Sequence, residues 1–360
     1  MNTPVDAMEM DVATPRAPRT APHATHKFKL LLKREFWEHK GGFLWAPVWA
    51  GAVSLLLALM ALVVGEVAAR KAIASGKMQI DGDVKINGLD LGALTSKIDP
   101  GDMDKLAGGV DLSMLASSMW PLVVLGFVVF FYCLGSLYDE RKDRSVLFWK
   151  SLPVSDRDTV LSKAASALLV APLIAVGVAI ACMFGFLLLL STFVLLHNGN
   201  PMTLVWGPGN PLQLAGSMLA TIPVYALWAL PTVGWLLLCS AWSKSKPFLW
   251  AIMLPVFSGI FISWFDIMNL FDLESGWFWK NIVARGLLSA VPGTWFDVAH
   301  INNAHITSSE AARQIESVHQ LLSLKTTYSV LLTPQLWIGA LAGAAMIYGA
   351  IRLRRWRDEG

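Results

Sequence analysis

The densest group of chemically versatile side chains lies between residues 139 and 158, where acidic and basic residues surround large apolar ones. Carboxylates and guanidinium or ammonium groups pair with opposite charges on another surface. Large aromatic side chains are unfavourable when they stay exposed to water. The residues that we single out are Asp139, Glu140, Arg141, Lys142, Leu147, Phe148, Trp149 and Pro153. Their pattern predicts a docking element, although a charged loop without a partner remains the simpler interpretation.

Motifs for nucleotide binding and for hydrolysis are absent from the 360-residue sequence. There is no GxxxxGK[ST] loop to hold phosphates, no HExxH and no GxSxG. His197 and His300 stand alone and are expected to be solvated or helix-capping residues. Asp81, Asp83 and Asp90 do not follow the spacing of an EF-hand. We therefore expect no metal, no cofactor and no catalytic centre in this chain.

Six long apolar stretches determine the expected fold class. None contains Lys, Arg, Asp or Glu within its central part, and about 20 apolar residues match the hydrocarbon core of a bilayer. We expect an all-α integral membrane protein with six transmembrane helices at residues 43–65, 119–138, 164–196, 213–242, 247–265 and 335–351. Because ion-coupled carriers keep ionisable residues at membrane depth, an ion-coupled carrier is not expected.

Prolines and small residues suggest how these helices pack. Pro172, Pro223, Pro231 and Pro255 each remove a backbone hydrogen bond and are expected to kink their helices. Gly339 and Gly343 form a GxxxG pattern that allows close approach of another helix. The sequence leaves open whether that helix belongs to the same chain or to a second copy.

The distribution of basic residues predicts the orientation. If the N-terminus is cytoplasmic, 19 of the 29 Lys and Arg residues lie on the cytoplasmic side, mostly in short segments. Both termini are then inside, as a disordered tail at 1–26 and a basic tail at 352–360. Residues 66–118 and 266–334 form two large outer loops. The net charge of +3 is too small to indicate nucleic-acid binding.

An amphipathic helix is expected at residues 27–41, just before the first apolar stretch. Phe28, Leu31, Leu32 and Phe36 fall on one helical face, while the basic residues lie mostly elsewhere. Such a helix would lie in the inner membrane interface and contact lipids. A merely basic segment beside the membrane is the alternative.

The segment after the second apolar stretch resembles the corresponding part of ABC-2 type transporter permeases, the membrane subunits of bacterial ABC export systems. The matching residues are Glu140-Arg141-Lys142, Leu147, Ser151-Leu152-Pro153-Val154-Ser155 and Lys163. The six apolar stretches, the amphipathic helix and the large outer loops are also similar to this family, so the resemblance covers residues 27–357. One departure is Arg144-Ser145, where many members have Gly-Thr.

The resemblance implies a permease in a bacterial cytoplasmic membrane that forms the path for ATP-driven transport, in the direction of export. Asp139 to Asp158 would then couple to a cytoplasmic ABC ATPase subunit, which would bind ATP and Mg. The permease is expected to pair with itself or with a sister permease.

Small polar groups within the apolar stretches are expected to line the transport path. They are Ser136, Thr221, Tyr225, Thr232 and Ser258. An uncharged lining suits an apolar or amphipathic cargo. Two other hypotheses remain open, a non-transporting membrane scaffold or sensor with ligand-binding outer loops, and a membrane-embedded enzyme, for which we find no catalytic pair.

Overall fold

The computed structural model describes residues 24–75, 91, 100–144, 154–268, 274–296 and 323–357, and these ranges contain helices and no strand. Six of the helices are long and apolar enough to cross a membrane. The expected all-α, multi-pass membrane protein is therefore confirmed at this level. Several residues discussed above lie outside the described residues, as does nearly all of the tail at 1–26. They are the docking residues Leu147, Phe148, Trp149 and Pro153, and also Asp81, Asp83, Asp90 and His300, at which no site is expected.

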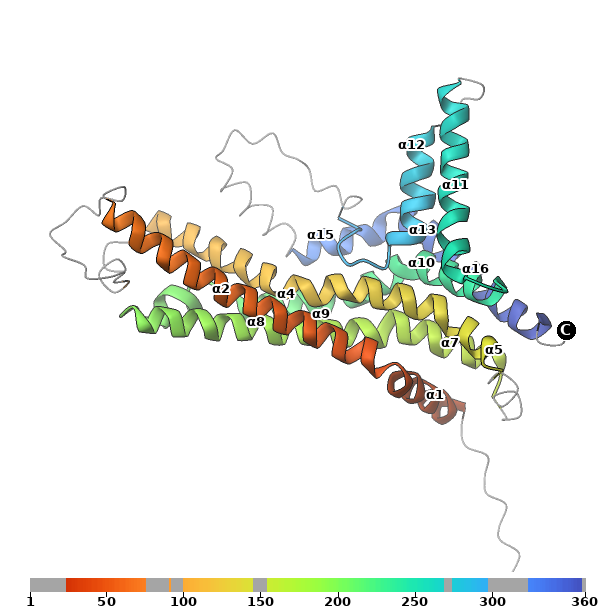
Figure 1. Ribbon diagram of the computed structural model, residues 1–360, viewed down its shortest axis with the longest axis horizontal. Coiled ribbons are helices and arrows are strands. Elements are labelled where there is room, and N and C mark those ends of the chain that lie inside the picture. The colour runs from red at the N-terminus through yellow and green to blue at the C-terminus, as the bar shows by residue number, and fades with distance from the viewer. Residues whose placement is uncertain are drawn as a thin grey trace, which may run out of the picture.

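The long helices lie side by side along the longest axis of the molecule (Figure 1). They are α2 (Ala46–Ala74), α4 (Pro100–Ser136) and α8 (Ala171–Leu196). α10 (Ile222–Trp242) packs against α4, and α16 (Pro334–Arg357) packs against α10. Three short helices gather at one end of this bundle: α1 (Ala24–Glu38), α5 (Tyr138–Lys142) and α7 (Asp156–Ala165). The last residues of α16 reach the same place, and we call this the charged end.

Several helices extend beyond the apolar stretches from which they were expected. α2 continues past Gly65 to Ala74, and α4 begins at Pro100, so much of the expected outer loop at 66–118 is a continuation of two long helices. An ion pair between Glu66 and Arg70, one turn apart, lies on the extension of α2. Similarly, α16 runs through most of the expected tail to Arg357. Hydropathy decreases at the first charged residue, whereas the backbone hydrogen bonds of a helix continue past it.

The expected fourth transmembrane helix is divided. α9 (Pro211–Ala220) ends at a turn at Thr221, and α10 starts at Ile222. Pro223 occupies the first turn of α10, where its missing N–H is tolerated. Pro172 follows a π-helical segment, Ser166–Val170, inside the continuous helical run of Asp156–Leu196. Pro231 and Pro255 also lie inside helices, so Pro223 alone of the four expected kinks is instead a helix start.

The closest helix contact is between α10 and α16. A methyl group added to Gly343 would lie 2.8 Å from the backbone nitrogen of Pro231 and would also meet the carbonyl oxygen of Leu230. Gly234 of α10 faces Gly343 in the same way. The GxxxG glycine at 343 is therefore used for packing within this chain.

A helical hairpin leaves the bundle at a steep angle (Figure 1). Its first arm is α11 (Pro247–Ile267); the second is the nearly continuous helix of α12 (Ser275–Phe278), a π-helical segment (Trp279–Ala284) and α13 (Arg285–Leu288). The indole N–H of Trp279 donates to the hydroxyl of Ser263 at 2.8 Å and joins the two arms. The outer part of α11 exposes large apolar side chains, including Phe257, Phe261 and Trp264.

Candidate functional site

A buried ion pair joins α1 to α7 at the charged end. The ammonium of Lys163 lies 3.0 and 3.2 Å from the two carboxylate oxygens of Glu35. Both side chains are 1% exposed. The hydroxyl of Tyr132, on α4, donates to the second oxygen of Glu35 at 2.8 Å. One carboxylate thus holds α1 against α7 and α4.

Glu140 extends this pair into a network. Its Oε1 lies 3.0 Å from the ammonium of Lys163, and its Oε2 accepts a 2.7 Å hydrogen bond from Nη1 of Arg354. Arg354 also donates from Nε to Asp156 at 3.1 Å, and Arg34 of α1 lies 3.5 Å from Glu140. These residues belong to α1, α5, α7 and α16, whose positions in the sequence are far apart.

Every charge of the network has a partner of opposite sign. Glu35, Glu140 and Asp156 face Lys163, Arg354 and Arg34. Arg34 also pairs with the exposed Glu38 at 3.2 Å, so four carboxylates surround three cations. Transfer of ions from water into a protein interior costs several kcal/mol for each ion unless pairing and hydrogen bonds compensate. Because each of these carboxylates is paired with a cation, none resembles a free general base. The arrangement is suited to holding helices together, and we define it as the ionic network.

The sequence positions the network through two local devices. The hydroxyl of Ser155 accepts a hydrogen bond from the N–H of Asp158 and caps the start of α7, as its position before Asp156 predicts. At α5, the guanidinium of Arg141 donates to the carbonyl oxygens of Ser240 and Ser243 at the end of α10. The hydroxyl of Ser240 in turn accepts from the N–H groups of Leu137 and Tyr138. α5 is therefore attached to α10 as well as to the network.

The expected docking residues divide into two groups. Glu140 and Arg141 face the bundle, where they make the contacts described above. Asp139 and Lys142 are exposed on the opposite side of α5. Asp139 and Lys142 are therefore accessible, whereas Leu147, Phe148, Trp149 and Pro153 lie outside the described residues.

The expected apolar face of α1 is partly or fully buried against the rest of the molecule, and Glu35 belongs to this face as well. Leu31 is buried, while Phe28, Leu32 and Phe36 are half-buried. Glu35, one turn from Leu31 and Leu32, is also on this face and is fully buried. Glu35, a single acid within an apolar helical face, was the one feature of the sequence that indicated the ionic network. The sequence alone could not show that Glu140, Lys163 and Arg354 complete it.

The expected path residues do not gather around one channel. Thr221 and Tyr225 line an apolar cavity of about 400 Å³ between α4, α8, α9, α10 and residues 292–296. The Tyr225 hydroxyl donates to the carbonyl of Ala290, and Thr232 donates to the carbonyl of Arg285. Ser136 and Ser258 donate to carbonyls of their own helices.

Arg285 is a second charged group in an apolar setting. Its guanidinium carbon lies 3.9 Å from the centre of the Trp228 ring, a cation–π contact between α13 and α10. Its Nε and Nη2 are buried and have no hydrogen-bond partner among the described residues. Burial lowers the pKa of Arg285 to about 10, so the group is still protonated at neutral pH.

His197 agrees with its expected capping role. It follows the last residue of α8, with Nδ1 2.8 Å from the carbonyl of Phe193 and Nε2 3.3 Å from a carboxylate oxygen of Glu66. Within the residues that the structure describes, no group of His, Cys, Asp or Glu side chains could hold a metal ion.

Comparisons of the chain with protein-family models, with curated proteins and with solved structures found no match. The functional interpretation therefore depends on the sequence features and on the geometry of the charged end.

Proposed function

We propose that this protein is the membrane-spanning subunit of an ABC-2 type export system in a bacterial cytoplasmic membrane. In this proposal the charged end faces the cytoplasm, and a separate ATPase subunit binds ATP and Mg. The single observation that carries the proposal is that the ionic network joins α5 and α7, the two helices that flank segment 145–153.

The network gives the docking segment a mechanical connection. A force on 145–153 would act on α5 and α7, which are bound through Glu140, Lys163 and Asp156 to α1 and α16. Arg141 adds a connection to α10. Because packed helices move as rigid elements, a shift at the charged end would be passed to four or five helices together.

The surface around the segment has the chemistry of a docking site. Asp139 and Lys142 are exposed beside it, and Phe148 and Trp149 lie within it in the sequence. An ATPase surface with a groove for two aromatic side chains and with charges of both signs would complement it. The cargo in this proposal is apolar or amphipathic, and the permease works as a dimer or with a sister permease.

Isolation of the chain with its partner tests the proposal. The tagged full-length chain is purified in mild detergent from the cells that naturally make it, and co-purifying proteins are identified by mass spectrometry. We expect an ATPase with a phosphate-binding loop in stoichiometric amount, with ATP hydrolysis that changes when the permease is present. Recovery of the intact chain without any nucleotide-binding partner would favour the scaffold or sensor hypothesis instead.

A further inference from the structure

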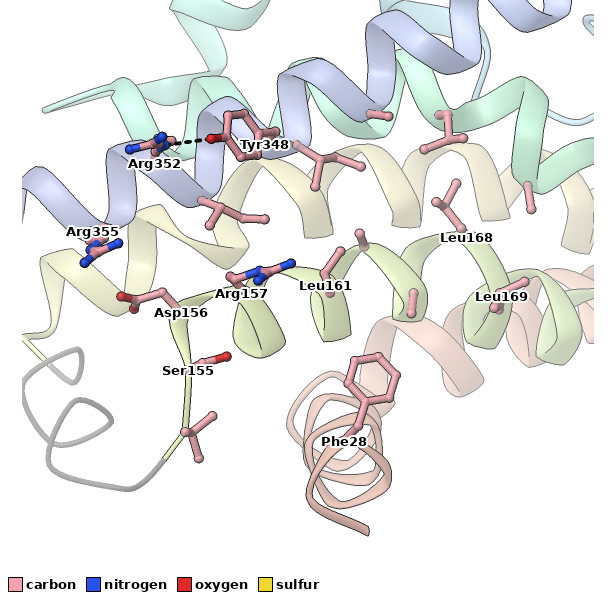
Figure 2. A pocket seen from close by; sticks show the side chains of 18 of the residues that line it. Phe28, Ser155, Asp156, Arg157, Leu161, Leu168, Leu169, Tyr348, Arg352 and Arg355 are labelled. Atoms are coloured by element: carbon pink, nitrogen blue, oxygen red, sulfur yellow. Dashed lines mark hydrogen bonds between the residues drawn. The ribbon is translucent and has the colours of Figure 1, made fainter. Parts of the chain in front are cut away.

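A large groove opens at the charged end, on a side of the bundle that the ionic network does not fill. It has a volume of about 1300 Å³ and lies between α1, α7 with the π-helical segment Ser166–Val170, α10 and α16. Figure 2 shows its wall of leucines, with Leu161, Leu168 and Leu169 along one side and Phe28 of α1 directed toward it. Leu161 and Leu169 remain 41% and 52% exposed, so the wall is open to the surrounding medium.

Three arginines lie along the groove near the charged end. Arg157 comes from the first turn of α7, while Arg352 and Arg355 come from the last turns of α16 (Figure 2). All three are exposed. Arg352 donates to the hydroxyl of Tyr348 at 2.9 Å, which holds its guanidinium beside the groove.

The charge of this rim is positive. Asp156 is the one acid among the residues that line the groove, and it already pairs with Arg354 of the ionic network at 3.1 Å. The rim therefore carries three cations next to a long apolar wall. A basic pocket between membrane-spanning helices, at the level where the apolar segments end, is a site that binds anionic lipid head groups.

We propose that the groove binds an anionic phospholipid from the membrane leaflet at the charged end. The phosphate would lie among Arg157, Arg352 and Arg355, and an acyl chain would follow the wall formed by Leu168, Leu227 and Leu230. Guanidinium groups bind phosphate oxygens through two parallel hydrogen bonds, so arginines suit this role better than lysines. The inference does not depend on the proposed transport function, because it concerns the groove and its rim alone.

Lipid retention by the purified full-length chain tests this inference. The chain is placed in nanodiscs of phosphatidylcholine with increasing amounts of phosphatidylglycerol, and bound lipid is measured by native mass spectrometry after release. We expect retention of about one phosphatidylglycerol and no retained phosphatidylcholine. Inorganic phosphate and glycerol phosphate, added as soluble competitors, should not displace the lipid at equal concentration. Displacement by either of them would mean that a small anion is the ligand, and it would overturn the proposal.

Two sets of variants identify the site. Arg157→Gln/Arg352→Gln/Arg355→Gln should weaken retention by about fivefold for each arginine, on the order of 100-fold in total. Lys33→Gln/Lys244→Gln/Lys246→Gln removes the same charge from exposed positions that do not line the groove and should retain the lipid. Equal loss in both sets would show that only the total charge matters and would contradict the proposal.

A steric variant tests the groove without changing its charge. Ala344 lines the groove and is exposed, whereas its neighbour Ala345 is exposed but does not line it. Ala344→Trp should abolish retention, and Ala345→Trp should leave it unchanged. Retention by Ala344→Trp, or efficient cross-linking of two copies through a cysteine at position 344, would assign the groove to another occupant and would overturn the inference.

Discussion

Lys163 and Glu35 form a buried ion pair across 128 positions of the sequence, with the ammonium 3.0 and 3.2 Å from the two carboxylate oxygens. Neither side chain reaches water to a measurable extent. The pair connects α1, which precedes the first long apolar helix, to the last turn of α7, so it ties the N-terminal helix to the bundle.

Removal of Lys163 should destabilise the fold strongly. Lys163→Met leaves Glu35 buried without its cation, and breaking a buried ion pair from one side costs about 3–5 kcal/mol. The double variant Glu35→Gln/Lys163→Met should lose less than the sum of the two single variants, because no charge at position 35 is then stranded. Thermal unfolding in detergent, followed by tryptophan fluorescence, measures the three variants.

An exposed ion pair provides the matched control for this cycle. Arg70 pairs with Glu66 on the surface of α2, and Arg70→Met should leave the unfolding temperature nearly unchanged. If Lys163→Met were as stable as Arg70→Met, the network would have no structural role and the mechanical connection would be refuted.

The contact of α10 with α16 gives a second prediction. Gly343→Ala places a methyl group against the backbone of Leu230 and Pro231 and should cost about 1–3 kcal/mol, because the helices must separate. Gly177→Ala is the control, since nothing lies within 4 Å of the added methyl group. Alanine is intrinsically better than glycine in a helix, so the control should be neutral or slightly stabilising. Equal unfolding temperatures for the two variants would disprove the close approach.

Although Arg285 is partly buried, replacing it should not lower the unfolding temperature. Arg285→Met loses a cation–π contact of about 0.5–2 kcal/mol but also removes two buried N–H-bearing atoms that lack hydrogen-bond partners among the described residues. We expect an unfolding temperature equal to or above that of the native chain. Trp228→Ala, which loses packing and the hydrogen bond to Thr294, should lower it. A large loss of stability in Arg285→Met alone would contradict this ranking.

The docking segment yields a functional prediction within the proposed export system. Phe148→Ala/Trp149→Ala should reduce binding of the ATPase subunit and its permease-dependent ATP hydrolysis at least tenfold, because aromatic anchors dominate the affinity of such interfaces. Insertion into the membrane should be unaffected.

Trp45→Ala/Trp49→Ala removes two exposed aromatic residues elsewhere and serves as the control. Unchanged ATPase binding by the Phe148→Ala/Trp149→Ala variant would place the docking site outside residues 139–158.

The number and type of long helices could be predicted from the sequence because the hydrocarbon core imposes a simple rule on each segment separately. About 20 residues without charge form a spanning helix wherever they occur. The ends of the helices could not be predicted in this way. Glu66 and Arg70 end the apolar stretch of α2, yet they pair with each other and the helix continues to Ala74.

The ionic network could not be predicted from any single segment of the sequence. Glu140 and Lys163 belong to the residues that carry the resemblance, and Glu140 was expected to face a partner as part of the docking element. Their burial depends on Glu35 and Arg354, which are brought to them only by the packing of α1 and α16. Glu35 within the apolar face of α1 was a local sign of burial, whereas nothing near Arg354 distinguishes it from the neighbouring arginines of the C-terminal helix.

The steep angle at which α11 leaves the other helices affects how the protein can be oriented in a planar bilayer. Membrane-spanning helices tilt by about 0–40° from the bilayer normal, so a bundle that stands upright in the bilayer would place this steeply departing hairpin closer to the membrane plane. Residues 243–246, with Lys246 in a left-handed backbone conformation at φ 48° and ψ 60°, are the covalent link between α10 and α11. The indole N–H of Trp235 also donates to the carbonyl of Ala251, and Trp242 packs edge-to-face on Trp250. Folding of the arm alongside its neighbours would have to break these contacts and those of Arg285 with Trp228 and Thr232. A spectroscopic distance measurement between the tip of the arm and α4 would detect such a movement.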